Sequence, residues 1–171
     1  MEVWAEDEAR IGLKPITRRV WATRGQRPIV VQKRGFKWLH VYAFVHPKRG
    51  NSEFWIISHV DLVCMQVVLD AFKVSVDPEN QKIIVLLLDN AGWHSSKNLV
   101  IPEGIILRFI PPYTPELSPA EGVIPLLHEC VANRLLEKLE DVEVLLDERC
   151  VFLRDHPDVV RGRCGFSWAS L

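Results

Sequence analysis

Short apolar and aromatic runs bounded by turn-forming residues predict the strands of this chain. Six runs fit this description: residues 1–12, 19–24, 38–45, 52–58, 82–88 and 104–110. The third and fourth are rich in aromatic and β-branched side chains and are separated by a short turn segment containing Pro, Gly and Asn, which predicts a hairpin. The fifth, residues 82–88, is almost entirely aliphatic, which predicts a buried strand at the centre of the sheet.

Apolar positions at helical spacing predict three helices. The first covers residues 62–76 and ends at an Asp-Pro pair. The second begins after Ser118, which is suited to be its N-cap, bends at Pro125 and continues to about Leu139. The third runs from there to about Asp155. Strands interspersed with helices predict an α/β domain with a mixed sheet.

Acidic groups on three separate elements are the candidate chemical groups. The cluster Glu6, Asp7 and Glu8 follows the short apolar stretch Val3-Trp-Ala5, and Asp89 directly follows the aliphatic run 82–88. Glu121 lies in the first turn of the second predicted helix, after a proline-rich loop. Carboxylates are the side chains that hold Mg²⁺, and phosphodiester chemistry is often performed with two such ions. Three carboxylates on separate elements are what a two-metal phosphoryl-transfer site requires.

The sequence around these acids resembles the IS630 and Tc1/mariner transposases. The similar blocks are Asp7-Glu8, then Leu88-Asp89-Asn90-Ala91 with His94, and Pro111-Pro-Tyr-Thr-Pro-Glu-Leu-Ser-Pro-Ala-Glu121. The resemblance implies a ribonuclease H-like fold, with antiparallel hairpin strands and a parallel central strand flanked by helices, in one catalytic domain over residues 1–171. It also implies that Asp7, Asp89 and Glu121 are the catalytic DDE triad and the ligands of Mg²⁺ or Mn²⁺, with two ions bound.

For four residues near the triad, the sequence leaves the role of the side chain open. His94 could orient a metal ligand or touch a phosphate, and it could equally be a turn histidine with satisfied hydrogen bonds. Asn90 could support the metal ligands from behind or only stiffen the turn. Glu6 and Glu8 flank Asp7, so strand alternation predicts that they point to the opposite face of the sheet.

The positive charge is concentrated in one segment. Between Arg10 and Gly50 there are eleven Lys or Arg and no Asp or Glu, although the net charge of the chain is only −1. This favours contact with the DNA phosphate backbone over an ordinary solvated surface. The residues expected to bind DNA are Arg18, Arg19, Lys33, Arg34 and Lys37.

Length, cysteines and apolar runs restrict the class of protein. The 171 residues suit one domain, and the four cysteines show neither a zinc-site nor a disulfide pattern. No signal peptide or membrane span is evident, so a cytoplasmic, nucleoid-associated protein of a prokaryote is expected.

The resemblance also bears on partners. It implies double-stranded DNA, at element ends and target, and a homodimer in the active form. Transposases of this kind carry a helix-turn-helix module before the catalytic domain, and that module is expected to be absent from this chain and supplied by a separate polypeptide or a missing N-terminal domain. The alternatives are another ribonuclease H-like nuclease and a non-catalytic DNA-binding or dimerisation remnant.

Overall fold

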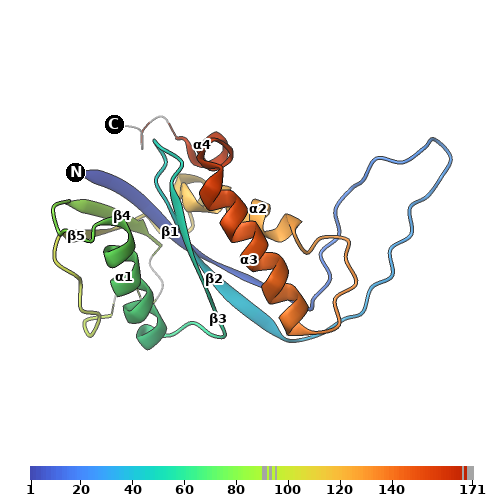
Figure 1. Ribbon diagram of the computed structural model, residues 1–171, viewed down its shortest axis with the longest axis horizontal. Helices are drawn as coiled ribbons and strands as arrows, with labels where there is room; N and C mark the ends of the chain where they lie inside the picture. Colours follow the sequence, from blue (N-terminus) through green and yellow to red (C-terminus); the bar gives the residue numbers. More distant parts are fainter. Residues whose placement is uncertain (90–91, 93, 95, 167, 169–171) are drawn as a thin grey trace.

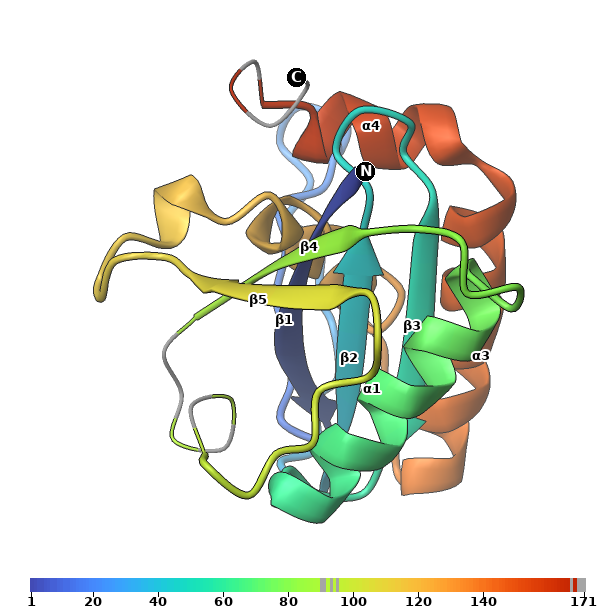
Figure 2. The ribbon, with the colours of Figure 1, turned by 90° about the vertical axis from the view of Figure 1, so that its left-hand side faces the viewer.

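A mixed five-stranded sheet forms the centre of the molecule (Figures 1 and 2). The computed structural model describes residues 1–89, 92, 94, 96–166 and 168. The strands are β1 (Glu2–Gly12), β2 (Trp38–Val45), β3 (Ser52–Ile57), β4 (Ile84–Leu88) and β5 (Ile105–Phe109). Their order in the sheet is β3-β2-β1-β4-β5, in which β2 is antiparallel to β1 and β3 while β4 is parallel to β1 and β5. The predicted mixed sheet and the hairpin of β2 and β3 are confirmed.

Helices cover both faces of this sheet (Figure 1). The α-helices are α1 (Leu62–Val76), α2 (Ile124–Glu129), α3 (Leu139–Asp155) and α4 (Pro157–Cys164), and two 3₁₀ turns, η1 (Pro115–Leu117) and η2 (Ala120–Gly122), precede α2. In Figure 2, α1 lies in front of the sheet and α3 behind it. The predicted helix over 62–76 is confirmed, with the Asp61 side chain accepting a hydrogen bond from the backbone N–H of Cys64 as its N-cap.

The two faces of β1 belong to two separate hydrophobic clusters. Ala5, Ala9 and Ile11 pack in the cluster formed with α2, α3 and α4, whereas Trp4 packs on the other face with α1. Because two strands lie on each side of β1, it is the central strand of the sheet. The prediction that residues 82–88 form the centre was wrong: β4 is internal but lies one position from the edge, and its aliphatic sequence reflects burial rather than central position.

Residues 13–37 form a long extended arm that leaves the sheet after β1 and returns at β2 (Figure 1). The strand predicted over 19–24 is wrong, because this whole segment is described and contains no strand. Its alternating residues have no neighbouring strand to pair with, and residues 17–34 are exposed throughout. Only the base of the arm is fastened, where the Asn133 side chain bonds the backbone of Arg18 in both directions at 3.0 Å.

The second predicted helix is much shorter than expected. Its first turn is the 3₁₀ turn η2, and α2 ends at Glu129, so residues 130–138 are outside any helix and the prediction of a helix to Leu139 was wrong. Pro125 stands in the first turn of α2 and begins this helix rather than bending a longer one, as proline does where no N–H is needed. The third predicted helix is confirmed as α3, and α4 was not predicted.

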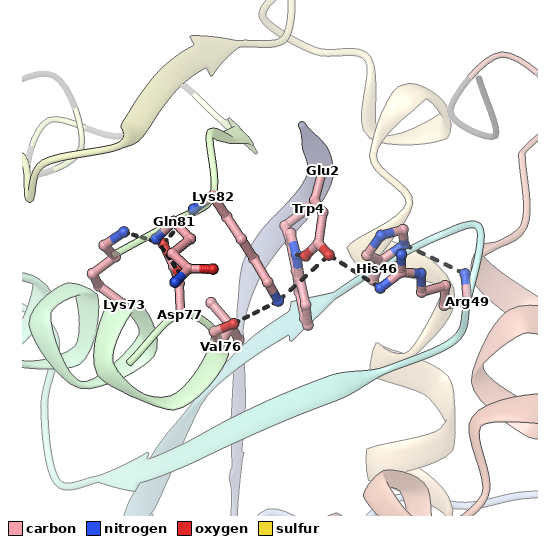
Figure 3. A network of polar contacts seen from close by, with 9 residues as sticks. All are labelled: Glu2, Trp4, His46, Arg49, Lys73, Val76, Asp77, Gln81 and Lys82. Carbon is pink, nitrogen blue, oxygen red and sulfur yellow. Dashed lines mark hydrogen bonds and ion pairs between the residues drawn. The ribbon is translucent and has the colours of Figure 1, made fainter. Parts of the chain in front are cut away.

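A polar network fastens the end of α1 to the starts of β1 and β4 (Figure 3). The carboxylate of Asp77 accepts hydrogen bonds from Lys73 and from the backbone N–H groups of Gln81 and Lys82. These bonds hold the pKa of Asp77 at about 2, below its usual range, against the opposing effect of burial. Lys82 in turn bonds the carbonyl oxygen of Val76 and pairs with Glu2.

Candidate functional site

Two acids meet because β1 and β4 run side by side in parallel. Their register places Ala5 opposite Leu87, and two residues further along each chain come Asp7 and Asp89. Asp89 directly follows Leu88, the last residue of β4. The parallel pairing therefore brings Asp7, on β1, beside Asp89, directly after β4.

Glu121 joins them from the 3₁₀ turn η2, which is pressed against α4. A Cβ atom added at Gly122 would lie 2.5 Å from the carbonyl oxygen of Arg163 in α4, so only glycine permits this close approach. Ala120, Val123 and Cys164 are fully buried in the same cluster. The unpredicted helix α4 thus supports the turn that carries Glu121.

The three carboxylates line one cavity of about 380 Å³. Its remaining wall is the proline-rich loop after β5, residues 110–115 with Ser118. Glu116 is not among the lining residues, which favours Glu121 over Glu116 as the third acid. Tyr113 stands fully exposed at this wall with a φ of 60°, a backbone conformation that is unfavourable for a bulky side chain.

Burial and neighbouring acids favour the protonated form of Asp7. Burial first, and then the negative charges of Glu121, Glu8 and Asp89, raise the pKa of Asp7 to about 7, although a hydrogen bond from the backbone N–H of Glu8 opposes this shift. Such an arrangement has a surplus of anionic oxygen atoms. Hard divalent cations with oxygen coordination, such as Mg²⁺ or Mn²⁺, fit this donor set, because they would neutralise the shared charge.

His94 holds Asp89 from behind. Its Nδ1 lies 2.8 Å from Oδ1 of Asp89, and its Nε2 lies 3.0 Å from Oε1 of Glu8. Burial alone would lower the pKa of His94, but the hydrogen bond and charge of Glu8 and the charge of Asp89 raise it overall. The ring is fully buried, so the prediction of an orienting histidine gains a geometric basis. Asn90 lies outside the described residues.

Glu6 and Glu8 face away from the Asp7 cavity, as strand alternation predicted. Both approach His94, and Glu6 is fully buried. The pairing of Glu8 with His94 was not predicted. The two residues are 86 positions apart, and the sequence around one gives no indication that the other lies beside it. Tyr113 was also missed, since its conformation and exposure have no local sequence signal beyond its place in the proline-rich block.

The residues predicted to bind DNA lie on the arm. Arg18, Arg19, Arg34 and Lys37 are exposed there, whereas Lys33 lies 3.7 Å from Glu137 in an exposed ion pair. At the base of the arm the guanidinium of Arg10 stacks over the ring of Trp38, 4.5 Å from its centroid. The basic segment is thus a projecting feature rather than one flat face.

Comparison with known proteins places this geometry in a known context. The model of the DDE superfamily endonuclease family matches residues 2–143. The uncharacterised protein y4pE/y4sA of Sinorhizobium fredii (strain NBRC 101917 / NGR234) is 33% identical over 106 residues, which are 61% of this chain and 77% of that protein.

Solved structures of the Mos1 mariner transposase share the fold. The paired-end complex with Mn superposes with a TM-score of 0.66 at 16% identity over 95% of this chain, and the isolated catalytic domain with 0.57 at 14% identity over 99% of this chain and 83% of that domain. The chain spans about half (53%) of the Mos1 chain in the complex. The expected ribonuclease H-like mixed sheet is confirmed.

In the part of the chain that the structure describes, no helix is long and apolar enough to cross a membrane.

Proposed function

Because this chain belongs to the DDE superfamily endonuclease family, we propose that it is the catalytic domain of an IS630-type insertion-sequence transposase that cleaves and transfers DNA strands. The observation that carries this proposal is the convergence of Asp7, Asp89 and Glu121 from three separate elements on one open cavity. Three such acids dispersed over a surface would carry no comparable argument.

Asp7, Asp89 and Glu121 are the proposed ligands of two Mg²⁺ or Mn²⁺ ions, which when bound would stabilise charge on the attacking and leaving oxygen atoms of a phosphodiester. Mos1 paired-end complexes are known with Mn and with Mg, which supports a divalent ion. Asp7 must lose its proton to become a ligand. His94 keeps the Asp89 carboxylate oriented, and the wall at residues 110–115 shields one side of the cavity from water.

We expect nicking of supercoiled plasmid DNA by the purified chain to require Mg²⁺ or Mn²⁺ and to stop in excess EDTA. The three acids alone provide no Lewis acid that could stabilise the charge on the phosphodiester oxygens. Product formation on an agarose gel measures this. A matched RNA–DNA hybrid should be a poorer substrate than duplex DNA. Preferential cleavage of the hybrid would instead identify a ribonuclease H-type nuclease, and absence of metal-dependent cleavage on every substrate would identify an inactive remnant.

The arm is proposed to supply affinity for double-stranded DNA irrespective of its sequence. Its cations extend from the sheet on a segment with no acid of its own, and Lys33 alone among the five predicted contacts has an acidic neighbour within 4.0 Å in the described structure. Each phosphate contact releases condensed counterions, so duplex affinity should fall with salt with a log-log slope of about −0.9 per contact.

Reversing Arg18, Arg19, Lys33 and Arg34 to Glu should weaken duplex binding similarly for all sequences and flatten the dependence of affinity on salt. Fluorescence anisotropy at several salt concentrations measures both effects. The control reverses Arg149 and Arg154 of α3, which is distant from the arm tip and outside the cavity. If both sets reduce affinity equally, the arm is an ordinary solvated segment.

The remaining partners are also proposals. The active form is proposed to be a homodimer, and a helix-turn-helix module outside these 171 residues is proposed to recognise the element ends, either on a separate polypeptide or in a longer chain. DNA cleavage and strand transfer would take place in the cytoplasm of a prokaryote, at the nucleoid. The similar Mos1 transposase forms a paired-end complex, which supports assembly on two DNA ends.

A further inference from the structure

Three side chains on the opposite face of β1 from Asp7 converge as a second set of metal donors. One ligand atom each of Glu6, Glu8 and His94 lies within 4.8 Å of the other two. Glu6 and His94 have fully buried side chains, and that of Glu8 is 11% exposed. We propose that these residues bind one divalent transition-metal cation, at a site distinct from the Asp7, Asp89 and Glu121 cavity.

The unsatisfied carboxylate of Glu6 is the observation that points to a ligand. Neither of its oxygen atoms has a hydrogen-bond partner among the described residues, and Oε2 lies 3.5 Å from Nε2 of His94. A buried carboxylate without a partner is costly, because it has lost its hydration without replacement.

A proton does not satisfy this group, whereas a metal ion does. If Nδ1–H of His94 donates to Asp89, a second proton on Nε2 can donate to Glu8 at 3.0 Å, but both oxygens of Glu6 remain without a hydrogen bond. A cation placed between the three side chains would contact Nε2 and one oxygen from each glutamate. It would therefore give the buried Glu6 carboxylate the positively charged partner that the described residues do not supply.

The distances suit a metal of the first transition series. Ligand atoms about 2.0–2.2 Å from a Zn²⁺ ion are separated from one another by roughly 3–3.5 Å. The separations of Nε2 from Glu8 and from Glu6 are 3.0 and 3.5 Å. One imidazole nitrogen with two carboxylate oxygens favours Zn²⁺, Co²⁺ or Mn²⁺ over Mg²⁺, which prefers oxygen ligands alone.

The proposed cation would also act on Asp89 through the imidazole ring. A metal-bound histidine commonly donates its other N–H to a carboxylate, which fixes the tautomer and the orientation of the ring. Here that carboxylate is Asp89, at 2.8 Å from Nδ1. Occupation of the second site would therefore fix one edge of the first cavity without contributing a ligand to it.

A second cluster must be controlled for in any experiment. His59, Asp61 and Cys64 also lie close enough to hold a metal, but their donor atoms already have hydrogen-bond partners, and the His59 and Asp61 side chains are 66% and 46% exposed. Asp61 is already used as the N-cap of α1. This cluster carries no inference of its own.

The test uses the full chain with Asp7→Asn and His59→Gln, which weaken the other two candidate sites, and Co²⁺ as the probe. We expect one equivalent of Co²⁺ to bind with a visible absorption spectrum typical of imidazole and carboxylate ligands, to be displaced by Zn²⁺, and to raise the melting temperature. Adding His94→Gln, or separately Glu8→Gln, should weaken Co²⁺ binding about 100-fold or more, since each removes a ligand. His156→Gln, an exposed histidine of the α3–α4 junction, is the matched control.

Two results would overturn the proposal. One is the lack of stoichiometric Co²⁺ binding in the double variant; the other is unchanged binding after both Glu8→Gln and His94→Gln. Either result would leave His94 as an imidazolium paired with Glu8. If His94→Gln does not fold, Glu8→Gln and Glu6→Gln decide, because the amide keeps the side-chain volume. DNA cleavage is not measured, so the result is independent of the proposed transposase activity.

Discussion

Asp89→Asn should reduce metal-dependent DNA nicking by about a thousandfold while leaving the fold intact. The amide keeps the size of the side chain, and its oxygen can still accept the hydrogen bond from Nδ1 of His94, so the position is preserved. Only the negative charge that would bind the cation is lost. Metal ions supply several kcal/mol of transition-state stabilisation, and about 4 kcal/mol corresponds to three orders of magnitude in rate.

Initial nicking rates at saturating Mn²⁺ measure this effect, and circular dichroism verifies the fold. Glu116→Gln is the matched control, because it removes an exposed acid five positions from Glu121 that does not line the cavity. The control should retain its full rate. Normal nicking by Asp89→Asn would remove Asp89 from the site and with it the proposed mechanism.

Asp7→Asn should stabilise the metal-free protein at alkaline pH. The folded-state pKa of Asp7 is about 7, above the unfolded value of 3.8, because of burial and the neighbouring acids, with Glu121 first among them. The contribution of the Asp7 carboxyl group to the free energy of unfolding is therefore complete below pH 3.8 and is lost as the pH rises through about 7. The loss has a limiting slope of about 1.4 kcal/mol per pH unit over roughly three units, so the variant should be more stable by roughly 4 kcal/mol at pH 8.

Urea unfolding in EDTA at pH 5 and pH 8 measures this difference, and added Mn²⁺ should reverse its sign. The ion binds the ionised carboxylate of the unaltered protein and stabilises the native state by mass action. Asp7→Asn should gain much less from the ion. Parallel pH dependence of the two proteins in EDTA would show that Asp7 is not held among like charges.

The placement of Asp89 followed from a local signal in the sequence, whereas only the family resemblance distinguished Asp7 from Glu6 and Glu8. Asp89 directly follows the aliphatic strand β4, so the element before it places this acid, whereas Asp7 lies in the middle of β1. Two parallel neighbouring strands then bring the acids together by register alone. The assignment of catalytic and metal-binding roles to them remains a prediction.

Contacts between distant segments could not be predicted in this way. Gly122 is explained only by the carbonyl oxygen of Arg163, a residue 41 positions later in a helix that no pattern indicated. The hydrogen bond between His94 and Glu8 forms only because the folded chain places β1 beside His94. Both depend on tertiary packing, which hydrophobic periodicity does not encode.

Local sequence patterns gave a wrong prediction where the segment has no neighbouring strand in the structure. Residues 19–24 have the residue types of a strand, but backbone N–H and C=O groups need a neighbouring strand to pair with, and the arm has none. Strand order was missed for a related reason. An aliphatic run reports burial on both faces, and both β1 and β4 are internal in this sheet.

The two ends of the arm lie directly opposite each other, since Gly12 pairs with Trp38 in the β1–β2 ladder. The sheet therefore receives the same strand ends whatever connects them, and each doubling in length of a flexible connection adds only about 0.6 kcal/mol of closure entropy. Insertions and deletions here should be tolerated over evolutionary time while the acid-bearing strands stay unchanged. The arm is thus the part of this fold where lineages can diversify and where an engineer can graft a different polypeptide.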